Sequence, residues 1–313
     1  MKCVCCGKTL PAGGVGWHKS CIHSFFDTDT LPVLDLDETA LKNLANESIN
    51  NGHTVPGVQK KLSLHLSKPG KKGRKKLTLT NYPIGYILKP QTEDYANLPE
   101  AEHLVMSMAR MVGIKTVPFA LLDCGGKLAY ITKRVDRTPD GTLLAMEDFC
   151  QLDGRLTQDK YKGSYERCAK IISRYSCQPG IDLSEFFMRI VFSYVVGNSD
   201  MHLKNFSLIQ TDGGKYALSP AYDMLPVSLV LPEDTEQLAL TLNGKKQNIR
   251  KKDFFALANS CGVPSSAAEK MIAGVVGRKE KFFDLCDESF LPKESKEMLK
   301  DLIAARLALL KAT

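Results

Sequence analysis

The stretch GNSDMHLKNFSL, residues 197–208, decides the interpretation of this chain, because polar groups follow directly on a buried apolar segment. The apolar segment is FFMRIVFSYVV at 186–196, and the polar residues after it are Asp200, His202, Lys204 and Asn205. Loops that are held by a rigid core element often carry catalytic residues. We therefore expect chemistry in this loop, and the rest of the sequence indicates which chemistry.

An acid, an amide and a second acid occur at a spacing that suits phosphoryl transfer. Asp200 and Asn205 form a D-x-x-x-x-N pattern, and Asp223 follows in LSPAYDML at the end of a predicted strand. A carboxylate can accept the proton of a hydroxyl group, while an amide oxygen and a second carboxylate can bind Mg²⁺. The spacing predicts a phosphotransferase, although on its own it is a weak signal.

Residues further upstream add the nucleotide-binding part of such a site. Lys89 ends a predicted strand in YILKP, and Glu102 lies in the following predicted helix, placed to hold that lysine. The glycine-containing turn TVPGVQKK precedes a strand and could cover phosphate oxygens with its N–H groups. Taken alone, Lys89 and Glu102 would more often be an ordinary surface ion pair. Their order along the chain favours a kinase-type site.

The hydrophobic pattern predicts an α+β fold of two lobes. Strands are expected around 62–66, 77–79 and 87–88 as an antiparallel meander. A helix of about a dozen residues follows, with Pro99 near its start and Gly113 at its stop, and then two strands in TVPFALLD and KLAYITKRVD. Helical patterns cover 164–176, 183–196, 252–259, 265–277 and 294–310. We expect a bilobal fold with a small β-rich N-lobe, a hinge near 133–137 and a larger helical C-lobe.

The N-terminus has the spacing of a metal site. Cys3 and Cys6 form a C-x-x-C knuckle, and His18 and Cys21 form an H-x-x-C knuckle. Three sulfurs and one nitrogen are a tetrahedral set that Zn²⁺ prefers, and four protein ligands indicate a structural role. Cys5 and His23 are alternative ligands, and unliganded thiols are the other interpretation. We expect the remainder of the chain to fold without this segment.

Bulk composition bounds the class of protein. The chain has 313 residues, 43% of them hydrophobic, and a net charge of +7, which weakly favours anionic partners. We expect no membrane span, no secretory signal and a cytoplasmic location with reduced thiols. The basic run KPGKKGRKK at 68–76 could bind a phosphate backbone, but such runs more often form solvated hairpin tips.

From about Thr54 onward the sequence resembles the HipA-type serine/threonine kinases, the toxins of bacterial toxin–antitoxin modules. The matching motifs are PGVQKKLSL, ILKP, EAEHLVMSMARMVGI, KRVDR, MEDFCQ, GNSDMHLKNFSL and LSPAYDML. The resemblance implies a bilobal protein-kinase-like fold that uses ATP and Mg²⁺. On this basis we expect four parts: a zinc-binding knuckle at 1–26, a linker and helix at 27–50, the N-lobe at 51–137 and the C-lobe at 138–313.

The resemblance also implies a role for individual residues. It makes Asp200 the catalytic base, with Lys204 near the transferred phosphate, and Asn205 and Asp223 the Mg²⁺ ligands. The implied nucleotide-binding residues are Gly57, Gln59, Lys61, Lys89 with its partner Glu102, and Asp136 at the hinge. His202 would orient the loop. Thr54 stands where the family has a self-phosphorylated regulatory serine, and Ser48, Ser63 or no residue are the alternatives.

The implied partners are a protein substrate of the aminoacyl-tRNA synthetase class and a helix-turn-helix antitoxin, with DNA contacted only through the antitoxin. Family members of full length carry a further N-terminal subdomain that is missing here, which suggests a split module of the HipBST type with a separate small protein. Met146 also departs from the family pattern, where a polar residue is common. The alternatives are a nucleic-acid-binding regulator on a kinase scaffold, and a small-molecule or lipid kinase.

Overall fold

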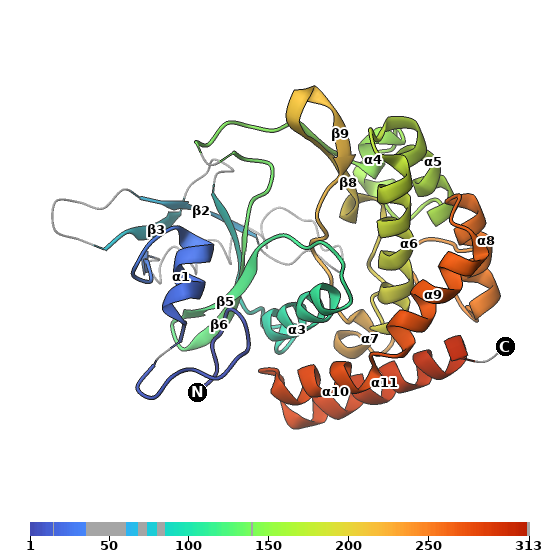
Figure 1. The fold of residues 1–313 in the computed structure, drawn as a ribbon. Helices are drawn as coiled ribbons and strands as arrows, with labels where there is room; N and C mark the ends of the chain where they lie inside the picture. The colour runs from blue at the N-terminus through green and yellow to red at the C-terminus, as the bar shows by residue number, and fades with distance from the viewer. Residues whose placement is uncertain (15, 36–60, 68–73, 80–84, 139, 312–313) are drawn as a thin grey trace. The chain divides into compact units, whose positions relative to one another are not determined.

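The computed structural model describes residues 1–14, 16–35, 61–67, 74–79, 85–138 and 140–311, which fall into two compact units (Figure 1). Unit 1 comprises Met1–His103 and Val117–Thr142, and unit 2 comprises Leu104–Thr116 and Leu143–Thr313. Several expectations lie outside the described residues: the helix predicted after residue 37, Thr54, Gly57, Gln59 and most of the basic hairpin tip.

Unit 1 is built on a six-stranded sheet. Its strands in spatial order are β1 (Val33–Asp35), β3 (Lys76–Leu79), β2 (Leu62–Leu66), β4 (Tyr86–Lys89), β6 (Lys127–Lys133) and β5 (Phe119–Cys124). The β1–β3 pair is parallel and the others are antiparallel. The expected meander is wrong in its strand order, because β2 lies between β3 and β4. With Leu62 and Leu64 buried, β2 is an interior strand that pairs on both sides.

The N-terminal segment packs onto this sheet and shares its core. Helix α1 (Lys19–Phe26) lies beside the sheet (Figure 1). This helix and the residues before it bury Trp17, Phe25 and Phe26 among sheet residues that include Leu64 and Tyr86. Burial of one large apolar side chain stabilises a fold by about 1.5–3 kcal/mol. The expectation that the remainder folds without the N-terminal segment therefore conflicts with this shared core.

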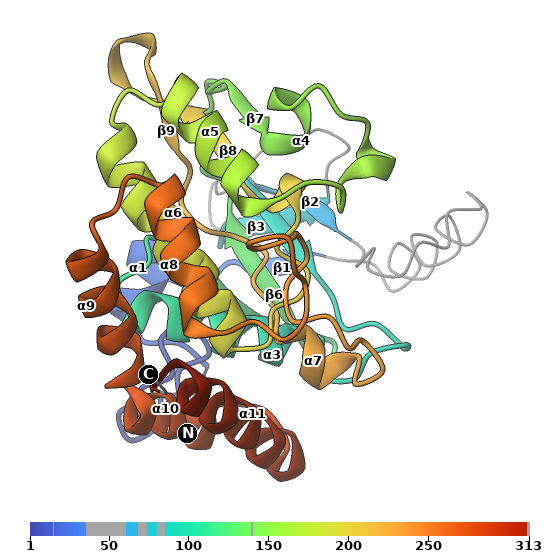
Figure 2. The ribbon, with the colours of Figure 1, turned by 90° about the vertical axis from the view of Figure 1, so that its right-hand side faces the viewer.

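Unit 2 is mainly helical and is organised around α6 (Pro179–Val195). The helices α5 (Tyr165–Tyr175), α8 (Lys251–Ser260), α9 (Ser265–Val276) and α11 (Lys293–Lys311) contact α6, and α10 (Lys279–Glu288) contacts α11 (Figure 2). The shorter elements are α4 (Phe149–Leu152), α7 (Val227–Val230), η1 (Thr157–Asp159), η2 (Leu203–Asn205) and η3 (Asp212–Gly214). Proline at the first position of α6 suits a helix start, since its missing N–H would have no helical partner there.

A small antiparallel sheet completes unit 2, and its middle strand directly follows the loop that begins at Gly197. Its strands are β7 (Met146–Asp148), β8 (Ser207–Gln210) and β9 (Tyr216–Leu218), with β8 in the middle. Helix α3 (Leu98–Met111) begins in unit 1 and runs on into unit 2. The mixed α+β class is confirmed. No helix among the described residues is both long enough and apolar enough to cross a membrane.

Candidate active site

A buried ion pair joins the strand lysine to the helix acid in unit 1. Lys89 Nζ lies 2.6 Å from Glu102 Oε1, with the two side chains 4% and 0% exposed. Lys89 Nζ also lies 5.3 Å from the centre of the Tyr130 ring on the neighbouring strand β6. Removing one partner of a buried ion pair costs about 3–5 kcal/mol, because the other charge is left without compensation. This pair is therefore a fixed part of unit 1 and not a surface ion pair.

In unit 2, Gly197 allows the chain to turn directly from α6 into the loop at 197–208. Its φ of 70° lies in the left-handed region, and a Cβ there would stand 2.5 Å from Leu302 Cδ2. The next residue, Asn198, is fully buried and accepts a hydrogen bond from Asp200 N–H through Oδ1 at 3.1 Å. The backbone that leads to Asp200 is thus fixed by local packing and a side-chain hydrogen bond.

Tyr161 holds the carboxylate of Asp200. The Tyr161 hydroxyl donates to Asp200 Oδ1 at 2.5 Å, and His202 Nε2 lies 3.8 Å from the same oxygen. The His202 ring meets the Tyr161 ring edge-on, with the ring centres 4.9 Å apart. Burial, together with the nearby Asp200 carboxylate, raises the pKa of Tyr161 well above its ordinary value. The phenol therefore stays protonated and acts as a donor to the carboxylate.

The loop also fixes Asn205. This side chain is 4% exposed, and its Nδ2 donates to the backbone oxygen of Asp200 at 2.7 Å. With the amide nitrogen engaged inside the loop, the amide oxygen is the atom that can act as a metal ligand. The backbone of Asp200 and the side chain of Asn205 are therefore brought together by a direct hydrogen bond.

Asp223 lies on a turn that is joined to the same loop. Its φ of 58° is uncommon for a residue other than glycine, and such backbone often occurs at functional sites. The preceding residue, Tyr222, donates its hydroxyl to Lys204 O at 3.1 Å and lies 2.5 Å from Ser207 Oγ. Two oxygen-bearing side chains, Asn205 and Asp223, thus stand on segments that are tied together, and oxygen ligands suit Mg²⁺.

The four predicted zinc ligands also come together, in unit 1. One ligand atom from each of Cys3, Cys6, His18 and Cys21 lies within 4.8 Å of the other three. His18 Nδ1 is 3.4 Å from Cys6 Sγ and 3.8 Å from Cys21 Sγ, while His18 Nε2 donates to Thr9 O at 3.1 Å. Such a second hydrogen bond fixes the tautomer and orientation of a metal-binding imidazole.

The pKa values of two ligands in the cluster are shifted in opposite directions. Burial, with smaller effects of the nearby Cys5 and Cys3 charges, raises the pKa of Cys21 well above its ordinary value. Burial alone would raise the pKa of Cys3, but N–H groups of Cys6, His18 and Cys5 bond to the sulfur and lower its pKa to about 7. The thiolate is the form that binds metals. Cys5 and His23 are not part of this group, since His23 instead lies 3.7 Å from Asp29. The geometry fits Zn²⁺, and its presence stays a prediction.

Comparison with known proteins now identifies the family. The model of the HipA-like C-terminal domain matches residues 53–282. The chain belongs to this family. A Sinorhizobium fredii relative named "Putative kinase Y4dM" is 36% identical over 221 residues, which are 66% of this chain and 53% of the relative. A Haemophilus influenzae relative named "Putative kinase" is 29% identical over 290 residues, or 83% of this chain and 82% of the relative. The chain thus spans about half the length of Y4dM.

Solved structures show the same fold at low sequence identity. HipA of Shewanella oneidensis MR-1, determined with HipB and operator DNA, superposes with a TM-score of 0.67 at 18% identity, over 94% of this chain and 72% of that one. The Helicobacter pylori proinflammatory kinase CtkA gives a TM-score of 0.55 at 16% identity, over 80% of this chain and 94% of that one. The fold and the names of the relatives together support a kinase.

Two residues of this HipA-like chain have partners that the family resemblance did not indicate. Lys204, expected near the transferred phosphate, bonds through Nζ to Asp148 Oδ2 at 2.6 Å. Asp136, expected beside the nucleotide, pairs with Arg134 at 2.5 Å and with Arg137 at 2.9 Å. Their contacts with a nucleotide stay predictions. Lys61, which is also expected to bind the nucleotide, is exposed and directly precedes β2.

Tyr161 is the site residue that sequence reasoning missed. It lies 39 positions before Asp200, in a short loop between η1 and α5. Hydrophobic periodicity and motif spacing report only on neighbours in the sequence, so neither could connect the two residues. A tyrosine two residues before a glycine in KYKGS is the only local signal, and it is a weak one.

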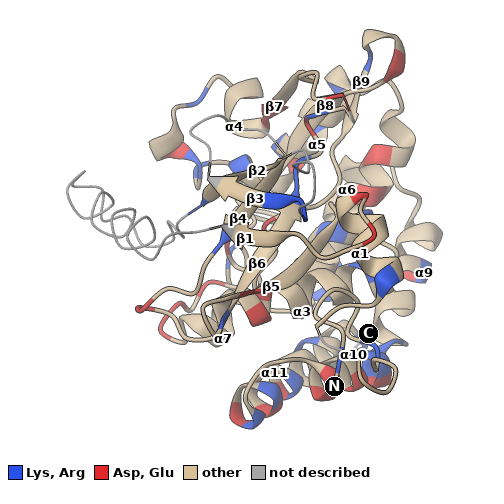
Figure 3. Cartoon of the chain, turned by 90° about the vertical axis from the view of Figure 1, so that its left-hand side faces the viewer, with Lys and Arg blue, Asp and Glu red and all other residues tan. Residues whose placement is uncertain are grey.

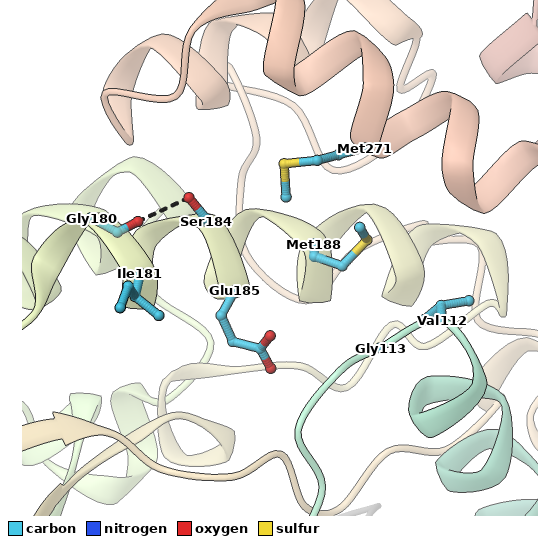
Figure 4. A pocket seen from close by; sticks show the side chains of 8 residues that line it. All are labelled: Val112, Gly113, Gly180, Ile181, Ser184, Glu185, Met188 and Met271. Atoms are coloured by element: carbon cyan, nitrogen blue, oxygen red, sulfur yellow. Dashed lines mark hydrogen bonds between the residues drawn. The ribbon is translucent and has the colours of Figure 1, made fainter.

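A hollow of about 410 Å³ in unit 2 contains none of the predicted site residues (Figure 4). It is lined by Val112, Gly113, Gly180, Ile181, Ser184, Glu185, Met188 and Met271. Its one carboxylate is already engaged, because Glu185 Oε1 accepts from Lys115 N–H at 3.1 Å and from Arg189 Nη2 at 3.0 Å. We therefore do not assign the chemistry to this hollow.

The charge pattern of α11 does not favour a nucleic-acid-binding role for that helix. On α11, lysines alternate with acidic residues, so that this helix carries both signs of charge (Figure 3). Of the basic hairpin, residues 74–76 are described, and Lys75 Nζ bonds to Asp27 O at 3.4 Å. Helix α11 therefore lacks the single-sign surface that phosphate-backbone binding favours, whereas residues 74–76 are all basic.

Proposed function

We propose that this HipA-like chain is a Mg-ATP-dependent serine/threonine protein kinase. The observation that carries the proposal is the catalytic loop, in which the Asp200 carboxylate is held by Tyr161 and its backbone oxygen by Asn205. The turn of Asp223 is tied to the same loop through Tyr222. A positioned base beside two oxygen ligands is the set that phosphoryl transfer needs.

In the proposed reaction, Asp200 orients the hydroxyl of an incoming serine or threonine and accepts its proton. The hydroxyl oxygen bonds to the γ-phosphorus of ATP as the bond from that phosphorus to the β,γ-bridging oxygen breaks, and ADP leaves. Asn205 and Asp223 would hold Mg²⁺, which neutralises charge on the phosphates. Lys89, kept in place by Glu102, would bind the α- and β-phosphates. Positioning and electrostatics supply most of the acceleration.

We also propose that the acceptor is an aminoacyl-tRNA synthetase and that the chain is the toxin of a toxin–antitoxin module. The family supports this, as does the fold shared with a HipA that was determined with HipB and operator DNA. A helix-turn-helix antitoxin and a separate small subunit are the proposed partners, and Thr54 is the proposed site of self-phosphorylation.

The test is expression of the wild-type chain and of Asp200→Asn in bacteria, followed by labelling of a panel of purified synthetases with γ-labelled ATP. We expect growth arrest and one labelled synthetase with the wild type, and neither with Asp200→Asn. Label on a small molecule or lipid would favour the related kinase class instead. Growth arrest by Asp200→Asn equal to that by wild type would contradict a kinase toxin.

A further inference from the structure

The metal-binding segment contacts both elements that carry the Lys89–Glu102 pair. We call residues 1–26, without residue 15, the knuckle. Lys89 ends β4 and Glu102 lies in α3, and all of these residues belong to unit 1. The knuckle contacts His103, which follows Glu102 in α3, and Tyr86, which is the first residue of β4.

The contact with α3 is made by His103. Its Nε2–H donates to the backbone oxygen of Cys5 at 3.2 Å, and its ring meets Phe119 edge-on, with the ring centres 5.4 Å apart. His103 is 5% exposed, so this polar contact lies inside unit 1. Cys5 stands between the ligands Cys3 and Cys6, so the position of its carbonyl depends on the turn that those two ligands close.

Tyr86 makes the contact with β4. Its hydroxyl donates to Phe25 O at 3.3 Å, and its ring centre lies 5.4 Å from that of Phe26. Burial, with a smaller effect of the Asp27 charge, raises the pKa of Tyr86 to about 12, so the hydroxyl remains a donor at neutral pH. Tyr86 and Lys89 are the first and last residues of the same strand.

We propose that the metal-loaded knuckle positions α3 and β4 and so sets the geometry of the Lys89–Glu102 pair, with His103 as the positioning residue. This inference rests on the proposed kinase function. The pair is a short, fully buried contact of 2.6 Å, so a small displacement of α3 weakens it. Metal binding at the knuckle and nucleotide binding at Lys89 are then coupled, and such coupling is reciprocal.

Trp17 provides the readout for the knuckle. It is the single tryptophan of the chain, it is 6% exposed, and its ring lies 5.4 Å from that of Phe26. Its fluorescence therefore reports on the packing of the knuckle independently of any activity. The full-length protein is stripped of zinc, returned to Mg²⁺ buffer, and titrated with Zn²⁺ and with ATP in either order.

In the wild type we expect Zn²⁺ to tighten Mg-ATP binding by at least about fivefold, and Mg-ATP to tighten Zn²⁺ binding by the same factor. His103→Phe removes the donor while keeping a ring. It should bind Zn²⁺ and keep buried Trp17 emission, yet bind Mg-ATP weakly whether or not Zn²⁺ is present. His103→Gln, which retains an N–H donor, should recover part of the coupling. His65→Phe, the same change at an exposed position of β2, is the control.

The outcomes separate the two proposals. If the zinc-loaded wild type fails to bind Mg-ATP, the proposed kinase function fails. If it binds Mg-ATP equally well with and without Zn²⁺, or takes up no Zn²⁺, the coupling is refuted and the kinase function stands. If His103→Phe loses buried Trp17 emission even with Zn²⁺ present, His103→Gln decides the matter. Partial recovery of the coupling in His103→Gln with buried Trp17 emission supports the proposal, and absence of any recovery in that variant refutes the role of His103.

Discussion

At the scale of single residues, the hydrogen bond from Tyr161 to Asp200 is the feature that most directly shapes the proposed chemistry. The Tyr161 hydroxyl donates to Oδ1 of the Asp200 carboxylate and fixes the position of that oxygen, and the hydroxyl stays protonated because burial raises the pKa of Tyr161. Hydrogen bonds to charged groups contribute about 1.5–3 kcal/mol. Tyr161 is thus a positioning residue for the base.

We predict that Tyr161→Phe lowers kcat by roughly 10- to 150-fold, which corresponds to a rise of about 1.5–3 kcal/mol in the activation free energy. The KM for Mg-ATP should change little, because the tyrosine acts on the base and not on the nucleotide. Steady-state kinetics on the preferred acceptor measure both values. Tyr216→Phe, at a partly exposed tyrosine of β9, is the matched control. An increase in kcat would instead mean that the hydroxyl blocks the base.

At the scale of elements, local sequence signals predicted some features and missed others for physical reasons. The helices over 164–176 and 265–277 were predicted to within a residue or two, because their apolar spacing and end signals are local. Helix α10 was missed, since it buries only Phe282 and Cys286. The order of β2, β3 and β4 depends on pairing between distant segments, and the hydrophobic pattern of a strand does not specify its neighbour.

Asp253 stabilises the start of helix α8 through side-chain hydrogen bonds. It is buried near the start of α8, where its Oδ2 accepts from Arg250 N–H at 2.9 Å and from Lys245 Nζ at 2.8 Å, and its Oδ1 from Asn243 Nδ2 at 2.9 Å. Burial tends to raise the pKa of Asp253, but the hydrogen bonds from Lys245 and Asn243 outweigh it and lower the pKa. The folded state therefore favours the carboxylate.

We predict that Asp253→Asn lowers the free energy of unfolding by about 1.5–3 kcal/mol at pH 7. The pKa of Asp253 is lower in the folded state than in the unfolded state, where it is about 3.9. Asp253 therefore stabilises the folded state fully at a pH above the unfolded-state pKa. This stabilisation is lost as the pH falls through the folded-state pKa. Urea unfolding of both proteins across this range measures the difference. Asp212→Asn, at an exposed position, should have no such effect. A difference that persists unchanged in acid would argue against the charge as its cause.

At the scale of the whole molecule, the knuckle is part of the core of unit 1. The ligand set was predictable because C-x-x-C and H-x-x-C spacings are local. The shared core was not, since Trp17 and Phe26 meet residues of strands that follow much later in the chain. Loss of the metal should therefore disturb the strands of unit 1 as well as the N-terminus, contrary to the expectation from sequence.

We predict one Zn²⁺ per chain, and its loss in the double variant Cys3→Ser, Cys6→Ser. In that variant, hydrogen exchange should become faster in β2, β4 and β6 of unit 1 and stay slow in α5 and α6 of unit 2, because only unit 1 shares its core with the knuckle. Cys177→Ser, at an exposed cysteine of unit 2, is the control. Unchanged exchange in all strands of unit 1 would show that its sheet is stable without the metal.

The proposed function depends on Asp200 acting as the base of a Mg-ATP-dependent phosphoryl transfer. The most direct measurement is the rate at which γ-labelled ATP transfers label to protein, either to the chain itself or to an acceptor, for the wild type and for Asp200→Asn, with ATP affinity measured in parallel. We predict a fall of about 10²- to 10⁴-fold in rate, the usual contribution of general base catalysis, with ATP affinity nearly unchanged. Equal transfer rates for the two proteins would contradict the account.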